Sequence, residues 1–538
     1  MINSVINEWR DTMVYGEYLD NVKKMIDDLK AMTADLGLGN APEEYNIITV
    51  LFTYKFLNDK LLHSFEHRED KSETFEDFVD YADSKTAKIE EKYLLTNLFQ
   101  KQNEKNFHKI FDDALKSISD LNKDVYSIET STGVKKPLME PMSVYLRDVD
   151  KEKELAKRAI NILCKYKFEN IYGKGWDYFS SIFEYLIKDY NNNSSKYAEY
   201  YTPASAGAIM ADILYDDTPV DKVTLYDPAA GSGTLLMSMA DKIGIKNCTL
   251  YSQDRSQKST QFLRINLILN NLAHSLANVV EGNTLTAPAH LQGDKLKQFD
   301  FIVSNPPFNV DFSADVETLK ADRYNRFFAG IPNIPNKDLK KMAIYLPFLQ
   351  HILSSLGPNG KAAIVVPNGF LTAGASIPLK IRKEIVDNYW LKGVIQMPGN
   401  IFATTGTNVS IVFIDKTQPE DTPVILIDAS ELGEKVKLED GQRTILLPDD
   451  ERLIIDTFKK KENIEKFSIK VSTEDIKEKK YSFSAGQYFA VAIDYDEITE
   501  KEFIERVSGY KTTLGRLFKE RTSLETELMK QLEELLYD

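Results

Sequence analysis

The chain has 538 residues, of which 43% are hydrophobic and 28% charged, and this globular composition is long enough for roughly two to four domains. A formal net charge of −15 at pH 7 argues against a free-standing nucleic-acid binder with a basic face, so a DNA substrate would require a partner that neutralises phosphates. Cys164, Cys248 and six scattered histidines show no ligand spacing, which argues against a disulfide framework and structural zinc.

The N-terminal segment MINSVINEWRDTMVYGEY carries charges throughout and has no apolar core, which argues against a signal peptide. No run of about 18 apolar residues occurs along the chain, so we expect no membrane-spanning helix. Together with the sparse cysteines, these features make the reducing cytoplasm the expected location.

Roughly the first third of the chain is predicted to be helical. Tyr45–Leu62 repeats apolar residues at the spacing of one helix face, and similar stretches occur at 88–99, 107–121 and 153–166. Trp176–Tyr190 predicts a further amphipathic helix, followed by the polar loop NNNSSK. Since the first third carries no chemical motif, we interpret it as a packing or docking domain.

From Lys222 onward, short β-rich runs alternate with helical segments. The seven runs, in chain order, are KVTLYD, NCTLYSQD, NVVEGN, FDFIVSN, KAAIVVP, LKGVIQMP and VSIVFID. This alternation predicts an α/β fold built on a doubly wound, mostly parallel sheet. Ligands of such sheets bind at the carboxyl ends of the strands, where the informative motifs of this chain occur.

The segment Leu225–Leu235, LYDPAAGSGTL, predicts a strand that ends in an acid and turns through glycines into a helix. Gly231 and Gly233 can adopt positive φ and let the backbone approach a ligand closely, while the helix offers free N–H groups to an anionic group. The next strand ends in Asp254, at a distance suited to ribose hydroxyls, and the third ends beside Asn283, whose amide suits an adenine ring. The pattern predicts a nucleoside-bearing cofactor, and it matches neither a Walker A loop nor GxGxxG.

A buried strand then ends in the tetrapeptide Asn305-Pro306-Pro307-Phe308. The residue types of this tetrapeptide suit methylation of an adenine amine. Such an amine is a weak nucleophile because its lone pair is delocalised into the ring. Acceptors on its N–H groups favour a pyramidal nitrogen, and the Asn305 side-chain oxygen and the Pro306 carbonyl can supply them. Consecutive prolines stiffen the loop, and Phe308 offers a stacking surface worth ~1–3 kcal/mol to an extruded base.

No general base is required beside the amine, because a methylated, cationic nitrogen readily loses a proton. Cys248 begins its predicted strand and Cys164 lies in a predicted helix, so neither is available as a nucleophile at a strand end. Carbon methylation of cytosine, which needs covalent attack, is therefore disfavoured.

The remaining chain divides less clearly. Residues 417–497 mix charged segments with short strands and give no clear assignment, whereas Leu514–Leu536 predicts an amphipathic helix. That helix is either a coiled-coil partner surface or a helix folded back on the body. We predict three parts: a helical domain at 1–170, a methyltransferase domain at 171–490, and a helical tail for partner docking at 491–538.

DPAAGSG, SQD, GNTL and NPPF, in this order, resemble the motifs of the amino-methyltransferases. Upstream, WDYFSSIFEYLIKDY and AEYYTPASAGAIMADIL look like the helix and FYTP segment of type I restriction–modification methylation subunits. Downstream, GKAAIVVPNGFL, IRKEIVDNYWLKGVIQMPGNIFATTGTNVSIVFIDK and YSFSAGQYF resemble segments of the same family. The resemblance runs from about Trp176 to Phe489.

This resemblance implies a Rossmann-like methyltransferase fold with an N-terminal helical domain and a C-terminal helix, S-adenosyl-L-methionine as cofactor, and site-specific methylation of adenine N6 in DNA. The implied catalytic residues are Asn305, Pro306, Pro307 and Phe308. The implied cofactor-binding residues are Glu199, Tyr200, Tyr201, Thr202, Pro203, Ala204, Asp227, Gly231, Ser232, Gly233, Asp254 and Asn283, with no metal. Residues 199–204 are implied to contact the methionine end of the cofactor.

Three segments depart from the family pattern. An acid is common where Asn283 stands, and we expect tuned rather than lost binding because an amide oxygen still accepts from the adenine amine. AEYYTP replaces the commoner GEFYTP, and SQD ends in Asp254 where Glu is also frequent, which shortens its reach by one methylene.

The resemblance also implies partners: two methylation subunits bind one specificity subunit that reads the DNA site, and a motor subunit joins for restriction. Two alternatives stay open. One is an amino-methyltransferase that acts on protein glutamine or on RNA, and the other is a scaffold that keeps the fold without the chemistry. The large helical N-terminus and YYTP favour DNA over the first alternative, and intact NPPF and DPAAGSG count against the second.

Overall fold

The computed structural model describes residues 2–39, 42–81, 86–123, 128–129, 135–137, 139–146, 148–168, 172, 202–374, 376–402, 408–438, 441–489 and 499–535. The chain divides into two compact units, Met1–Tyr488 and Phe489–Asp538. The predicted helix at Trp176–Tyr190 lies outside the described residues. The predicted division of the first unit at residue 170 stays a prediction.

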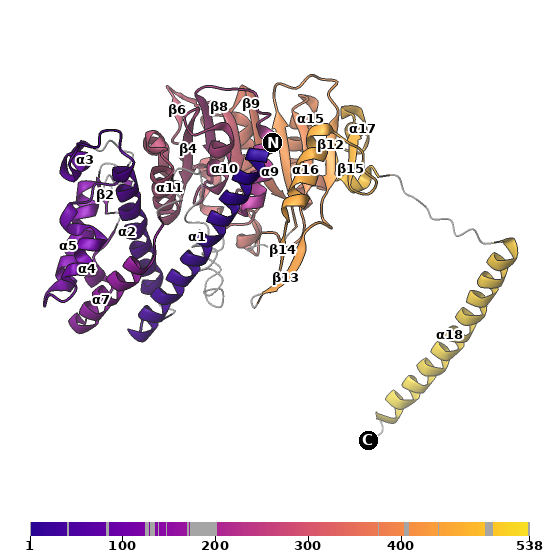
Figure 1. Cartoon of the computed structure of the whole chain (residues 1–538). Helices are drawn as coiled ribbons and strands as arrows, with labels where there is room; N and C mark the ends of the chain where they lie inside the picture. Colours follow the sequence, from indigo (N-terminus) through magenta and orange to yellow (C-terminus); the bar gives the residue numbers. More distant parts are fainter. Residues whose placement is uncertain are drawn as a thin grey trace. The chain divides into compact units, whose positions relative to one another are not determined.

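The N-terminal region is helical, as the sequence predicted (Figure 1). Its elements are α1 (Ile2–Asp35), α2 (Pro42–Glu66), α3 (Phe75–Tyr81), η1 (Glu91–Tyr93), α4 (Leu95–Lys101), α5 (Phe107–Leu121), the short strands β1 (Ile128–Glu129) and β2 (Lys135–Lys136), η2 (Met142–Val144) and α7 (Val149–Lys165). In α5, Phe107, Phe111, Leu115 and Ile118 recur at helical spacing and are all buried.

The predicted helix over 88–99 is wrong in its first part. Only η1 and the beginning of α4 are helical there, because Leu94 adopts extended backbone (φ −61°, ψ 141°) and separates the two. The predicted helix over 153–166 is confirmed as α7, which begins earlier because Asp148 caps it. The Asp148 carboxylate accepts the backbone N–H groups of Asp150 and Lys151.

All seven β-rich runs of the sequence form strands of one sheet. The strands are β3 (Val223–Asp227), β4 (Cys248–Asp254), β5 (Val279–Glu281), β8 (Phe299–Ser304), β9 (Leu356–Pro367), β10 (Leu391–Gln396) and β11 (Val409–Asp415), joined by β12 (Val424–Asp428) and β15 (Ser468–Val471). The order is β15-β12-β10-β11-β9-β8-β3-β4-β5. Strands β5, β4, β3, β8 and β9 are parallel, whereas β11 pairs antiparallel with both β9 and β10. The predicted doubly wound, mostly parallel α/β sheet is confirmed.

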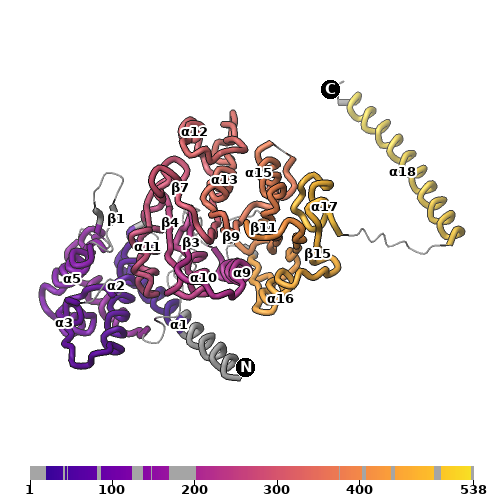
Figure 2. Tube along the Cα trace, turned by 90° about the horizontal axis from the view of Figure 1, so that it is seen from above, coloured from indigo at the N-terminus to yellow at the C-terminus, as the bar shows by residue number. Residues whose placement is uncertain are grey.

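Helices cover both faces of this sheet. Figure 2 shows α9 (Ala204–Leu214), α10 (Thr234–Ile243) and α16 (Pro448–Lys460) along one face, with α13 (Tyr345–Ser355) and α15 (Ser376–Asp387) along the other. The remaining elements are α11 (Gln257–Leu269), η4 (Ala273–Asn278), β6 (Leu291–Gln292), β7 (Lys295–Leu296), η5 (Ser313–Asp315), α12 (Val316–Lys320), η6 (Leu339–Lys341), α14 (Gly369–Thr372), β13 (Glu434–Leu438), β14 (Gly441–Ile445), α17 (Thr473–Glu478) and η7 (Ala485–Gln487). The strands between these helices are rich in Val, Ile and Leu because both faces of the sheet are buried.

The order of the strands creates a crevice beside β3. The chain passes from β3 outward through β4 to β5, and then returns to the opposite side of β3 as β8. The loops that leave the carboxyl ends of β3 and β8 therefore diverge. Such a reversal point is where open α/β sheets bind their ligands.

The described part of residues 417–497, which the sequence left unassigned, contributes two strands to the sheet, the hairpin β13–β14 and the helices α16, α17 and η7. The second unit contains α18 (Glu500–Leu535), so the predicted C-terminal helix is confirmed and begins well before Leu514. Within the part of the chain that the structure describes, no helix combines the length and the apolar character needed to cross a membrane.

Candidate active site

A cavity of about 460 Å³ lies at the carboxyl ends of β3, β4, β5 and β8. Its lining comes from the loops that follow these strands, from Thr202 two residues before α9, and from an apolar wall around α13. The lining residues are Thr202, Asp227, Pro228, Ala229, Ala230, Gly231, Ser232, Thr234, Leu235, Asp254, Arg255, Ser256, Gly282, Asn283, Thr284, Asn305, Pro307, Val310, Ile344 and Phe348. Residues of the glycine turn and of the NPPF tetrapeptide therefore line the same cavity.

The glycine turn has the backbone conformation that its sequence predicts. Gly231 and Gly233 have φ values of 53° and 91°, in the left-handed region that L side chains rarely adopt. The Gly231 N–H donates to Asp254 Oδ2 at 2.9 Å, which ties the turn to the end of β4. Directly after Gly233, α10 begins and presents its first N–H groups at the cavity, a site suited to an anionic group.

We expect Gly233→Ala to weaken binding of the predicted nucleoside-bearing cofactor at least about tenfold and to destabilise the fold by roughly 1–3 kcal/mol. A Cβ at this position would lie 2.2 Å from Leu263 Cδ1, and the positive φ is strained for alanine. Calorimetric titration and thermal melting measure both effects. Gly486→Ala is the matched control, because a Cβ there meets nothing within 4 Å. Equal behaviour of the two variants would contradict the role of the turn.

Two carboxylates stand at adjacent strand ends. Asp227 is buried, and its Oδ1 accepts from the Ala229 N–H at 2.9 Å and from the Ser304 hydroxyl at 2.8 Å. Burial raises the pKa of Asp227 to about 7, against the lowering effect of these two donors. Burial also raises the pKa of Asp254, although the backbone N–H groups of Ser256 and Gly231 oppose this shift. Both side chains are thus held by main-chain donors and oriented at the cavity.

The loop after β5 forms the far side of the cavity. Asn283 is engaged at both ends of its amide: Nδ2 donates to Asp315 Oδ2 at 3.2 Å, and Oδ1 accepts the Leu285 N–H at 3.1 Å. A carbonyl oxygen has two lone pairs, so Oδ1 keeps one site for a ligand donor. The neighbouring Thr284 hydroxyl donates to the Pro228 carbonyl at 2.6 Å and joins this loop to the glycine turn.

A buried arginine supports this loop from behind. Arg326, with 1% of its surface exposed, donates to the carbonyls of Thr284 at 3.0 Å and Leu285 at 2.5 Å. Its guanidinium also forms an ion pair with Asp322 at 2.8 Å, in which both side chains are buried. One side chain therefore holds two consecutive carbonyls of the cavity wall.

His351 links Arg326 to the central strand. Arg326 Nη1 donates to His351 Nδ1 at 3.2 Å, and His351 Nε2 lies 3.0 Å from the hydroxyl of Tyr226 in β3. Burial lowers the pKa of His351 well below its ordinary value, and the Arg326 and His290 charges lower it further. The ring is therefore neutral, with Nδ1 accepting and the proton on Nε2. This network connects β3, α13 and the loop after β5.

The NPPF tetrapeptide leaves β8 at the rim of the cavity. Asn305 is half-buried, and its Nδ2 donates to the Thr202 hydroxyl at 3.2 Å. Pro306 is buried and Pro307 exposed, while Phe308 is half-buried and packs edge-on against Tyr345 with ring centroids 6.2 Å apart. The tip is held from both sides, as a preorganised acceptor requires.

Most described site residues of the sequence analysis meet in the cavity. Those that line it are Thr202, Asp227, Gly231, Ser232, Asp254, Asn283, Asn305 and Pro307. Pro203, Gly233, Pro306 and Phe308 are adjacent in the chain to lining residues without lining the cavity themselves, and Ala204 lies two residues after Thr202. Glu199, Tyr200 and Tyr201 lie outside the described residues. The roles that the resemblance implies for these residues stay predictions.

Sequence reasoning missed the apolar wall of Val310, Ile344 and Phe348. Val310 and Ile344 lie at the two ends of a long excursion that is closed by the bridge between Asn309 and Ala343. Single apolar residues so far apart carry no local signal. Arg326 was also missed, because a lone arginine in a charged segment is normally solvated.

The lining suits a nucleoside-bearing cofactor. Carboxylates match ribose hydroxyls, a glycine turn with a following helix N-terminus matches an anionic group, and the apolar wall matches a flat ring. Among the described residues, no group of three His, Cys, Asp or Glu side chains is gathered as metal ligands. The lining thus combines binding groups for such a cofactor with an amide acceptor at the rim.

Comparison with known proteins gives one family match, to N-6 DNA Methylase, over residues 174–497. The chain is 31% identical to the type I restriction enzyme MpnII methylase subunit of Mycoplasma pneumoniae over 336 residues, 60% of this chain and 59% of the relative. It is 27% identical to the MjaIX methylase subunit of Methanocaldococcus jannaschii over 379 residues, 67% of this chain and 63% of the relative. The chain thus spans less than two thirds of the length of each relative.

Solved structures share the fold. A type I restriction-modification methyltransferase subunit from Streptococcus thermophilus superposes with a TM-score of 0.68 at 21% identity, covering 88% of this chain and 99% of that chain. A modification subunit of a putative type I restriction enzyme from Vibrio vulnificus gives a TM-score of 0.57 at 17% identity, covering 85% and 93% of the respective chains.

Proposed function

Since this chain belongs to the N-6 DNA methylase family, we propose that it is the methylation subunit of a type I restriction–modification complex and methylates adenine N6 in DNA. S-adenosylmethionine is the proposed methyl donor. The observation that carries the proposal is that Asn305, at the end of β8, and the Gly231–Gly233 turn, at the end of β3, open onto the same cavity. An extruded purine can then lie between the acceptor and the cofactor.

The residues of this chain act by binding and orientation. Asp254 accepts ribose hydroxyls, and Asn283 Oδ1 accepts from the adenine amine of the cofactor. Thr202 contacts the methionine end, and the Gly231–Gly233 turn with the start of α10 forms the loop that receives the anionic group. When bound, S-adenosylmethionine would supply a methyl group on a sulfonium sulfur: the amine nitrogen would bond to the methyl carbon as the carbon–sulfur bond breaks, the thioether would leave, and the cationic nitrogen would then lose a proton. Asn305 Oδ1 and the Pro306 carbonyl accept hydrogen bonds from the two N–H groups of the adenine amine. This arrangement directs the lone pair of the amine nitrogen toward the methyl donor. The Asn305 side chain needs no change of charge for this role.

The substrate class is tested by methyl transfer from labelled S-adenosylmethionine to duplex DNA, RNA and protein, with the specificity subunit present. We expect label in the adenine of duplex DNA. Transfer to RNA or to protein glutamine, with none to DNA, would establish the alternative amino-methyltransferase reading. Absence of transfer to every substrate by a folded, cofactor-binding complex would favour the scaffold reading.

We propose that α18 docks on the specificity subunit, with two copies of this chain per specificity subunit and a motor subunit joining for restriction. Apolar residues of α18 recur at alternating steps of four and three positions, and Arg521 and Gln531 occupy two of these steps. This is the heptad spacing of a coiled coil, in which single polar residues specify register. The apolar members, all exposed, are Phe503, Val507, Tyr510, Leu514, Leu517, Leu524 and Leu528.

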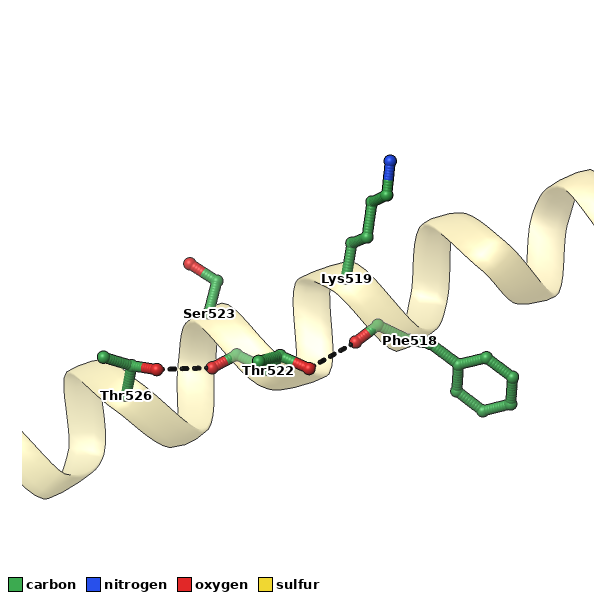
Figure 3. A pocket seen from close by; sticks show the side chains of 5 residues that line it. All are labelled: Phe518, Lys519, Thr522, Ser523 and Thr526. Carbon is green, nitrogen blue, oxygen red and sulfur yellow. Dashed lines mark hydrogen bonds between the residues drawn. The ribbon is translucent and has the colours of Figure 1, made fainter.

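A second surface feature of α18 lies outside these heptad positions. Figure 3 shows the shallow hollow between Phe518 and Thr526, where Lys519 and Ser523 project away from the Phe518 ring. The hydroxyls of Thr522 and Thr526 donate to carbonyls of the same helix at 3.0 and 2.8 Å. All five lining residues belong to this one helix, so the hollow has no second wall.

Replacing Leu517 and Leu524 together by Glu is expected to weaken co-assembly with the specificity subunit by roughly 100-fold, because two seam positions become charged. Cofactor affinity should not change, because the cavity belongs to the other unit. Ser523→Glu with Thr526→Glu, on the polar side, is the matched control and should assemble normally. Deleting the chain after Gly509 should abolish assembly. An intact complex after this deletion would refute the docking role.

A further inference from the structure

The contact between Thr202 and Asn305 joins two segments that the sequence analysis treated separately. Asn305 Nδ2 donates to Thr202 Oγ1 at 3.2 Å, and both residues line the cavity. Only 9% of Thr202 is exposed. The hydroxyl is therefore a fixed neighbour of the proposed catalytic amide and is largely shielded from solvent.

A proline and a packed helix restrict the backbone that follows Thr202. Thr202 precedes Pro203, whose ring restricts the conformation of both residues. Pro203 is the N-cap residue of α9, and its carbonyl accepts the Gly207 N–H at 3.2 Å. Helix α9 packs so closely on α10 at Gly207 that a Cβ at this position would lie 2.5 Å from Ser238 Oγ. Thr202 is thus positioned by the same helix pair that carries the glycine turn.

The chemistry of the amide gives this contact a consequence. An asparagine side chain has an acceptor oxygen at one end and an NH₂ donor at the other. The adenine amine brings N–H groups to Asn305, so only the oxygen end can accept from it. If the Asn305 amide were turned by 180°, its NH₂ group would face the N–H groups of the adenine amine, and no hydrogen bond could form between two donors. A hydroxyl that accepts from Nδ2 holds the amide with its oxygen on the opposite side.

We propose that Thr202 is a positioning residue that fixes the Asn305 amide with Oδ1 available to the target amine. This role rests on the proposed function. The family resemblance assigns Thr202 to the methionine end of the cofactor, and the two uses are compatible, because one hydroxyl can accept a hydrogen bond and donate another. Thr202 then serves the cofactor through its proton and the catalytic amide through its lone pair.

The test compares Thr202→Val, which keeps the shape without the hydroxyl, with Thr202→Ser, which keeps the hydroxyl. In the complex with the specificity subunit on duplex DNA, Val should lower the single-turnover rate roughly tenfold, as expected for one neutral hydrogen bond. The KM of the Thr202→Val variant for DNA should stay within about twofold of wild type. The Thr202→Ser variant should recover the single-turnover rate to within about threefold of wild type. Thermal melting of each full-length variant verifies folding.

Cofactor affinity separates the two uses of the hydroxyl. Calorimetric titration of each full-length variant with S-adenosylmethionine gives a Kd, and rates are compared at saturating cofactor. A Val variant whose whole defect disappears at saturation would overturn the positioning role. A Val variant as fast as wild type would overturn it too, and would leave the proposed function intact. Inactive wild-type complex on DNA would remove the proposed function and this role with it.

A double-variant cycle provides a second, independent test. In an Asn305→Ala background no amide remains to be oriented, so adding Thr202→Val should change the residual rate by less than about twofold. Single turnover with excess enzyme measures this low rate. If the Val substitution still costs roughly tenfold in that background, Thr202 acts through another group and the proposal is wrong.

Discussion

Replacing Asn305 by alanine is expected to reduce methyl transfer to DNA by at least about 100-fold, the scale on which enzymes lose rate when one preorganised hydrogen-bonding group is removed. The reason is geometric. Asn305 is the side-chain acceptor of the NPPF tip, and it lines the same cavity as the glycine turn. Without its oxygen, the adenine amine keeps its lone pair conjugated with the ring. Incorporation of labelled methyl into duplex DNA by the complex with the specificity subunit measures the loss.

Cofactor affinity distinguishes this loss from unfolding. Because most of the proposed cofactor-binding groups lie at the ends of β3, β4 and β5 and do not contact Asn305, the Kd of Asn305→Ala for S-adenosylmethionine should stay within about threefold of wild type. Asn309→Ala is the matched control: Asn309 is an exposed asparagine at the start of the next loop and does not line the cavity. The control should keep the wild-type rate. Unchanged methylation by Asn305→Ala would show that Asn305 is not catalytic.

Replacing Arg326 by leucine is expected to destabilise the methyltransferase fold by about 3–5 kcal/mol, the usual cost of removing one partner of a buried ion pair. The substitution leaves the buried Asp322 carboxylate without its cation and frees the carbonyls of Thr284 and Leu285. His351 Nδ1 also loses its donor. Chemical denaturation followed by tryptophan fluorescence measures the change in the free energy of unfolding.

The neighbouring arginine supplies the control for this prediction. Arg323 is exposed, so Arg323→Leu should change the free energy of unfolding by no more than about 0.5 kcal/mol. Arg326→Lys should recover only part of the stability, because an ammonium restores the charge without the planar fork that contacts two carbonyls and Asp322. If Arg326→Leu proves as stable as Arg323→Leu, the network does not support the cavity wall.

The acidic balance of the chain agrees with the proposed division of labour. With a formal net charge of −15, the chain carries the chemistry without an overall basic surface, and a partner would supply much of the attraction for DNA phosphates. The exposed heptad positions of α18 are where we propose that such a partner attaches. The Leu517 and Leu524 substitutions separate this attachment from the cofactor site.

Local sequence patterns were sufficient for the centre of the fold. The seven β-rich runs, the glycine turn and NPPF each report burial and turn chemistry over a few consecutive residues. Because parallel strands end at one edge of a sheet, knowing which motifs follow strands was enough to predict that Asp254 and Asn305 belong to one site. The strands β12 and β15 escaped prediction because they are short and lie within a charged, irregular segment.

Other features depend on contacts between residues that are distant in the chain. Thr202 meets Asn305 across 103 positions, Tyr226 meets His351 across 125, and Arg326 reaches Thr284 across 42. No periodicity connects such pairs, since their approach follows from the packing of helices on the sheet and from the reversal of strand order at β3. The amino-acid pattern therefore accounts for the chemistry available at the strand ends. The packing of the folded chain selects which polar groups face one another, as the contact of the Asn305 amide with Thr202 illustrates.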